Sequence, residues 1–184
     1  PNLWDAVRVS VDRRNEEGLY ILTGSNSIDK SEIMHTGTGR IDTLMMYPMS
    51  LYESGESNGS ISLADLFSKS DVLENGCESD LTIDQLIFAA CRGGWPSSLH
   101  KKSDKAKLLV ARSYFDSLCA EDITNVDGVQ RDETTTRLLL RSYARNISTM
   151  VANRTIIKDI NANVELSEAT FYNYIKALKK LFLI

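Results

Sequence analysis

The chain has 184 residues, with 21 Lys and Arg against 25 Asp and Glu, a formal charge of -4 and 42% hydrophobic residues. This composition excludes a disordered or collagen-like chain and predicts a globular protein with a sizeable core. No apolar run approaches the ~20 residues that a membrane-spanning helix needs, and charges interrupt the first apolar positions. We therefore expect a cytoplasmic protein with no membrane partner.

The first fifty residues predict an α/β arrangement. Apolar residues at positions 3, 4, 7 and 11 follow helical spacing. The unbroken run Leu19–Thr23 is typical of a strand that is covered on both faces of a parallel sheet. Residues 41–47 are a further strand candidate, which Pro48 ends. We therefore expect a parallel sheet at this end of the chain.

The middle of the chain predicts helices only. Thr82 and Gln85 have capping-box spacing and open an apolar stretch that Gly93 and Gly94 end. Two longer helices are expected from about Asp104 to Ala120 and from about Asp132 to Val151.

The last thirty residues predict two helices joined by a short turn. A short helix is expected at Ile156–Ile160, followed by a turn and a longer helix that Ser167 opens. Phe171, Ile175, Leu178 and Phe182 repeat on one side of the longer helix, which is the pattern of a helix-turn-helix. Its outward residues are Tyr172, Lys176, Lys179 and Lys180.

This basic end of the chain has two open interpretations. Residues 131–184 carry nine Lys and Arg against five Asp and Glu, a net charge of +4. Lysines on an outer helix face bind nucleic-acid phosphates and displace counterions. The same helix pair also serves protein packing alone, and no Arg, Asn or Gln combination for base recognition is apparent on the outer face.

Metal and nucleotide motifs are not apparent in the sequence. The three cysteines lack CxxC spacing and the two histidines lack HxxxH spacing, so we expect no metal site. The chain also contains no Gly-Lys pair, and therefore no GxxxxGK[ST] loop for ATP phosphates.

Five elements in order nevertheless resemble a known family. They are Leu22-Thr23-Gly24-Ser25, then Gly37-Thr38-Gly39-Arg40, then Pro48-Met49-Ser50-Leu51-Tyr52-Glu53, then Arg92-Gly93-Gly94-Trp95-Pro96, then the helix-turn-helix. This order resembles prokaryotic AAA+ superfamily ATPases, in which an AAA-type core precedes an uncharacterised helical and winged-helix domain. The resemblance implies the C-terminal part of a P-loop NTPase-like sheet at residues 1–70. It implies a helical lid-like region at 71–152 and a partial winged helix at 153–184.

The resemblance also implies residue roles. Thr23, Ser25 and Asn26 match a group that senses the nucleotide phosphate, and Arg92 matches a lid sensor. Arg40 matches an arginine finger or phosphate sensor that acts within a subunit or across a homo-oligomer interface.

The family pattern places Walker A and Walker B upstream of Pro1 and the wing downstream of Ile184. We therefore expect the parent protein to be an ATPase or switch that uses ATP and Mg²⁺. The fragment alone is expected to lack catalysis and to hold no cofactor. The alternative is a DNA-binding or regulatory adaptor that acts through the helix-turn-helix, and a third is an interaction domain without a ligand.

Overall fold

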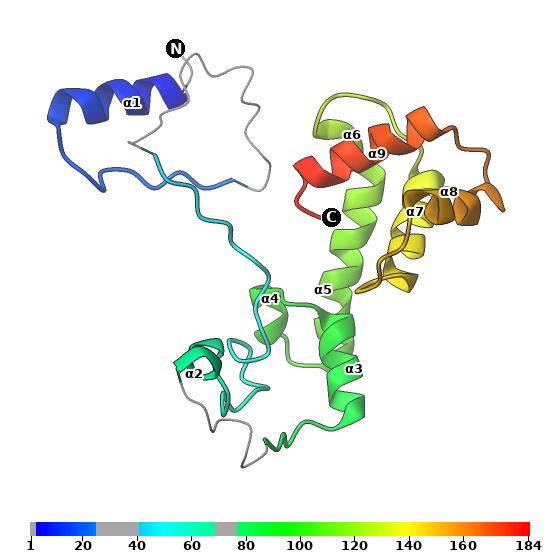
Figure 1. Ribbon diagram of the computed structural model, residues 1–184, viewed down its shortest axis with the longest axis horizontal. Coiled ribbons are helices and arrows are strands. Elements are labelled where there is room, and N and C mark those ends of the chain that lie inside the picture. The colour runs from blue at the N-terminus through cyan, green and yellow to red at the C-terminus, as the bar shows by residue number, and fades with distance from the viewer. Residues whose placement is uncertain (1–2, 25–40, 69–76) are drawn as a thin grey trace. The chain divides into compact units, whose positions relative to one another are not determined.

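The structure is a computed structural model that describes residues 3–24, 41–68 and 77–184 (Figure 1). These residues form helices separated by turns and irregular segments. The α-helices are α1 Leu3–Arg14, α2 Leu63–Ser68, α3 Ile83–Arg92, α4 Pro96–Leu99, α5 Asp104–Ser117, α6 Ile123–Asn125, α7 Glu133–Arg145, α8 Asn153–Asn161 and α9 Glu168–Lys180. A π-helical turn, η2 Leu118–Asp122, connects α5 to α6. No helix within the described residues is long and apolar enough to cross a membrane.

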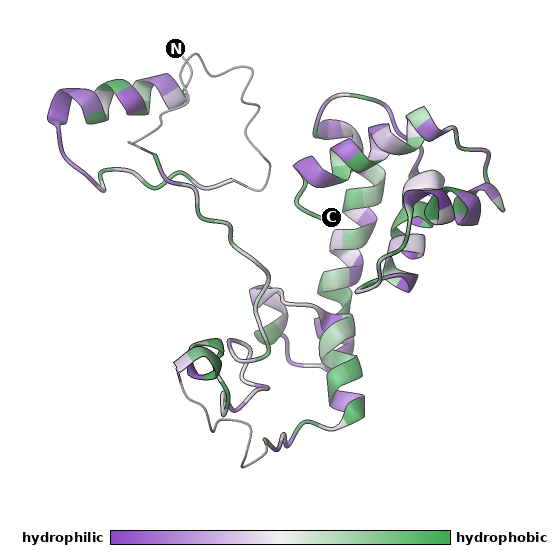
Figure 2. Cartoon of the chain, viewed as in Figure 1, coloured by the Kyte–Doolittle hydropathy of each residue, from purple (hydrophilic) through white to green (hydrophobic). Residues whose placement is uncertain are grey.

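The predicted α/β fold with a parallel sheet is wrong, because the described residues contain no strand. Residues 19–24 and 41–50 are irregular, and the side chain of Ile21 is 91% exposed. Figure 2 shows these segments as coil despite their apolar residues. A strand exists only when its backbone N–H and C=O groups pair with a neighbouring strand, and an apolar run does not provide that neighbour. The structure is therefore helical.

The chain divides into two compact units, one formed by Met45–Asp116 and the other by residues 1–44 together with residues 117–184. The three-part division expected from the sequence stays a prediction.

In the Met45–Asp116 unit, α3 begins after the capping box and ends at the glycine that the sequence predicts. Thr82 Oγ1 accepts a hydrogen bond from the Gln85 backbone N–H at 3.3 Å, and Gln85 Oε1 accepts one from the Thr82 N–H at 2.8 Å. Gly93 ends the helix with a φ of 72°, a conformation that favours glycine. The predicted capping box is confirmed.

The other unit contains the main hydrophobic core, which lies between η2 and the end of α9. Its buried residues are Leu118, Cys119, Ile123, Leu139, Ile156, Ile160, Leu166, Phe171, Tyr174, Ile175, Ala177 and Leu178. α7 packs on both η2 and α8, and α6 packs on α9. The two predicted helices after residue 153 are therefore present as α8 and α9, and their apolar sides face one core.

Candidate functional site

The helix α9 has one buried face and one exposed face. The buried face carries Phe171, Tyr174, Ile175, Ala177 and Leu178. On the opposite face Tyr172 is 47% exposed, and Lys176 and Lys179 are exposed as well. Because the core holds one side of the helix, these three side chains are presented to solvent by a fixed backbone.

The turn before α9 is held by side chains that bond to the backbone. Asn161 Oδ1 accepts a hydrogen bond from the Leu166 N–H at 2.8 Å, and Ser167 Oγ accepts one from the Thr170 N–H at 3.1 Å. Leu166 is itself buried. The six residues 162–167 that connect α8 to α9 are therefore anchored at both ends.

Lys180, the fourth predicted binding residue, differs from the other three. It is only half-exposed, and its charge acts on the carboxyl group of Asp127. Hydrogen bonding to Arg131 is the main cause that lowers the pKa of Asp127, and Lys180 adds a smaller effect of the same sign. Lys180 therefore lies at the edge of the exposed face, close to the loop that precedes α7.

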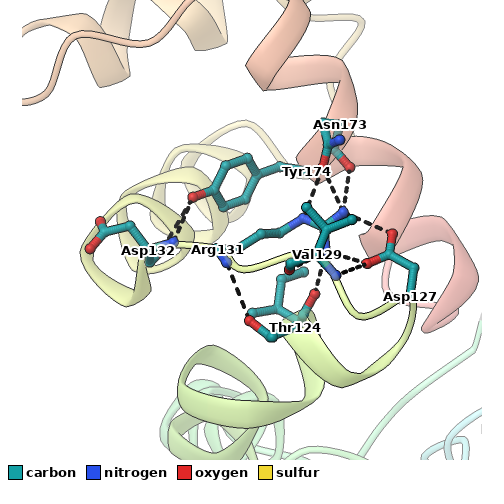
Figure 3. A network of polar contacts seen from close by, with 8 residues as sticks. Thr124, Asp127, Val129, Arg131, Asp132, Asn173 and Tyr174 are labelled. Atoms are coloured by element: carbon teal, nitrogen blue, oxygen red, sulfur yellow. Dashed lines mark hydrogen bonds and ion pairs between the residues drawn. The ribbon is translucent and has the colours of Figure 1, made fainter.

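That loop is attached to α9 by Arg131, whose side chain is only 2% exposed (Figure 3). Its Nη1 donates to the Ile123 carbonyl and to Asp127 Oδ1, each at 2.7 Å, and its Nη2 donates to Asp127 Oδ2 at 2.8 Å. Nε and Nη2 both donate to Asn173 Oδ1 on α9, at 3.1 and 2.6 Å. One guanidinium thus joins α6, the loop and α9.

Tyr174 strengthens this attachment from the same helix. Its hydroxyl oxygen accepts a hydrogen bond from the Asp132 N–H at 2.9 Å, and its ring centroid lies 5.8 Å from the Arg131 guanidinium carbon. That geometry fits a cation–π contact.

A hollow of about 370 Å³ lies beside this network. It is lined by Val129, Gln130, Arg131, Ala169, Thr170, Asn173 and Tyr174. Two residues with side-chain amides, Gln130 and Asn173, therefore line one hollow beside α9. Sequence reasoning missed both, because Gln130 reaches α9 only through the tertiary fold. The sequence feature that could have pointed to Asn173 is its position directly after Tyr172, a predicted binding residue.

Arg92, predicted as a lid sensor, is 4% exposed and paired with Glu56. Its Nη1 lies 2.5 Å from Glu56 Oε1, its Nη2 lies 3.1 Å from Oε2, and its Nε donates to the Gly93 carbonyl at 3.2 Å. Ser54 Oγ also bonds to Glu56. The guanidinium is therefore already occupied by a carboxylate, in the two-point geometry that suits arginine.

The same region joins two of the sequence motifs. The Met49 N–H donates to the Gly94 carbonyl at 2.9 Å. A Cβ at Gly94 would lie 2.6 Å from both the N and the O of Met49, so the close backbone contact requires glycine. A hollow of about 380 Å³ follows this contact and is lined by residues from 49–54 and 86–94. The Pro48–Glu53 and Arg92–Pro96 motifs thus form one structural unit.

The remaining predicted site residues come from the first part of the chain. Thr23 is exposed in an irregular segment, and Ser25, Asn26 and Arg40 lie outside the described residues. Within the described ranges, no group of three or more His, Cys, Asp or Glu side chains is placed to hold a metal ion.

Comparison with known protein families gives two matches. Residues 1–55 match the model described as an AAA domain, and residues 83–184 match the model described as Domain of unknown function (DUF8612). Searches of curated proteins and of solved structures found no significant match. The AAA match covers the LTGS, GTGR and Pro48–Glu53 motifs, and the second match covers α3 to α9. Because this second match spans more than half of the chain, the protein belongs to the DUF8612 family, and residues 1–55 before the match are similar to an AAA domain.

Proposed function

We propose that the protein is an AAA-type nucleotide-dependent ATPase or switch whose C-terminal helices bind duplex DNA. The nucleotide part is supported by the AAA-domain match, which includes Thr23, Ser25, Asn26 and Arg40. In this proposal a parent protein with a P-loop holds Mg-ATP, and these four residues respond to the nucleotide phosphates. Arg92 is left out of this group because Glu56 occupies its guanidinium.

The test of the nucleotide part is the substitution Arg40→Ala in a parent protein that carries a P-loop. An arginine that stabilises the transferred phosphoryl group contributes roughly a thousandfold or more to kcat. We expect ATP hydrolysis to fall by about that factor, measured as phosphate release. Arg14→Ala is the matched control, because Arg14 is exposed and pairs only weakly with Glu16 at 3.2 Å. An Arg40→Ala protein with unchanged kcat would remove Arg40 from the mechanism.

The DNA part is carried by the exposed face of α9. Tyr172, Lys176 and Lys179 stand on α9, the second helix of the α8–α9 pair, while the opposite face of α9 is buried. In a helix-turn-helix the second helix enters the major groove, and lysines on it reach phosphates. Residues 131–184 carry the net charge of +4 that such a contact needs, although the whole chain is acidic.

The test of the DNA part is the salt dependence of binding to a fluorescent duplex of roughly 20 base pairs, about two helical turns. Each phosphate-bound lysine contributes about 0.9 to the slope of log K against log salt. We expect Lys176→Gln with Lys179→Gln to reduce that slope by about 1.8 and to weaken binding for all sequences. Lys101→Gln with Lys102→Gln is the matched control, because both lysines are exposed and lie before α5.

These experiments distinguish the alternative functions from one another. If the wild-type protein does not bind the duplex at low salt, α9 serves protein packing and the DNA part is wrong. If neither Mg-ATP nor duplex raises the Tm of the parent protein, the third interpretation holds, because a ligand that binds only the folded state raises the Tm.

A further inference from the structure

The side chain of Asn173 has a defined orientation. Arginine has N–H donors and no acceptors, so the atom of Asn173 that faces Arg131 is the oxygen Oδ1. The Nε and Nη2 groups of Arg131 donate to this oxygen at 3.1 and 2.6 Å, which matches its two lone pairs. Arg131 is buried and also paired with Asp127, so it cannot easily release the amide.

The amide nitrogen of Asn173 consequently points away from the network. Figure 3 shows Nδ2 directed away from Arg131 and without a dashed line, and no hydrogen bond of this atom is found among the described residues. The residue is exposed. Asn173 therefore presents two N–H donors and no available acceptor on its side chain.

The position of Asn173 fits a contact with DNA. It lies three residues before Lys176, and Tyr172 lies four residues before Lys176, so both are neighbours of Lys176 on the surface of α9. It belongs to the N-terminal half of the helix, the part that contacts base edges when a helix-turn-helix docks in the major groove.

We propose that Asn173 is a DNA-contacting residue of the α9 face and donates Nδ2–H to an acceptor on duplex DNA. This inference rests on the DNA-binding function proposed above. The acceptor is a phosphate oxygen or a base edge, and among the bases guanine is favoured, because its major-groove edge offers two acceptors, N7 and O6, whereas adenine and thymine each offer one. The usual two-point contact of asparagine with adenine is excluded, because that contact needs Oδ1 as an acceptor for the adenine amino group.

The test uses Asn173→Asp, which keeps an oxygen for Arg131 and removes both donors. Ala169→Asp is the matched control, because it adds the same charge on an exposed position of α9, four residues before Asn173, and leaves the Asn173 amide in place. Both variants are first compared with the wild type by Tm and by backbone amide spectra. Duplexes that bind are then selected from a pool with a randomised centre and sequenced.

If the acceptor is a base, the wild type prefers guanine at one position by roughly tenfold. Asn173→Asp loses this preference, and Ala169→Asp retains it despite weaker binding. If the acceptor is a phosphate, the wild type has no such preference, and Asn173→Asp weakens binding to every duplex more than Ala169→Asp does. Equal binding and equal preference of the two variants would overturn the inference.

A second measurement separates this inference from the function on which it rests. In a ¹⁵N-labelled protein, the side-chain amide signals of Asn173 should shift when the duplex is added, together with the backbone signal of Lys176. A shift at Lys176 without one at Asn173 overturns the role of Asn173 and leaves DNA binding in place. Absence of duplex binding by the wild type overturns both.

Discussion

Two arginines, Arg92 and Arg131, are buried with their charges, and each is matched by a carboxylate. Arg92 pairs with Glu56, and Arg131 pairs with Asp127. A buried guanidinium is tolerated only when its N–H groups are satisfied. Asp127 and Arg131 have the same i,i+4 spacing as the more exposed pair Glu133–Arg137, and Glu56 lies 36 residues from Arg92, so no local pattern marks either arginine as buried.

At this residue scale we predict that Glu56→Gln destabilises the protein. Removal of the carboxylate leaves the charge of Arg92 without compensation in a site where only 4% of its side chain is exposed. Broken buried pairs cost several kcal/mol, and we expect about 2 kcal/mol here because Glu56 itself is 23% exposed. The free energy of unfolding in urea measures the effect. Glu16→Gln, which removes an exposed pair, should change it by less than about 0.5 kcal/mol.

The same pair predicts a pH dependence. The hydrogen bond from Arg92 is the main cause that lowers the pKa of Glu56 below its ordinary value of 4.5, and Ser54 adds to it against the effect of burial. A lowered folded-state pKa gives stability that is fully present above the ordinary value and is lost as the pH falls through the folded-state value. Unfolding measured between pH 7 and pH 3 should show this loss, and Glu56→Gln should reduce it. An equal acid dependence in both proteins would contradict this assignment.

At the element scale, α9 shows how much a local pattern predicts. The spacing of Phe171, Ile175 and Leu178 correctly indicates the buried face, and Ser167 correctly indicates the start of the helix. Phe182, predicted on the same face, lies beyond the end of α9 and is 47% exposed, so that part of the prediction is wrong. The expected end of the helix near Val151 is wrong, because α7 ends at Arg145 and Ser148 adopts a φ of 58°. Helix starts are determined by local capping, whereas this end is decided by how the following chain turns back to form α8.

We predict that Phe171 and Tyr172, adjacent in sequence, have opposite roles. Phe171 is fully buried in the core, so Phe171→Ala should lower the free energy of unfolding by about 3 kcal/mol or more. Tyr172 is about half exposed, so Tyr172→Ala should cost less than about 1 kcal/mol and should instead weaken duplex binding. Urea unfolding and duplex anisotropy of both variants measure the two effects. A large loss of stability in Tyr172→Ala would show that this face is structural.

At the scale of the whole molecule, the main core lies within residues 118–178, and the Arg92 region lies in the Met45–Asp116 unit. We predict that Phe171→Ala raises amide hydrogen exchange in α7, α8 and α9 by about a hundredfold, because local opening follows the stability of the unit that contains the amide. Exchange in α3 should change much less. The same acceleration in α3 would show that the two units open together.

Local chemistry in the sequence determined α3, α5, α8, α9 and the start of α7, because caps and apolar spacing act over a few residues, but it did not predict α4, η2 or α6. It also determined which side of α9 is apolar and where the lysines stand. The predicted sheet failed because a strand needs a partner that the apolar run Leu19–Thr23 does not contain. Only the tertiary structure decided which arginines are buried. It also placed Arg131 against Asn173, so that the side-chain amide of Asn173 keeps only its N–H donors for other contacts. Such contacts join residues far apart in the chain, and their geometry depends on packing that no local pattern contains.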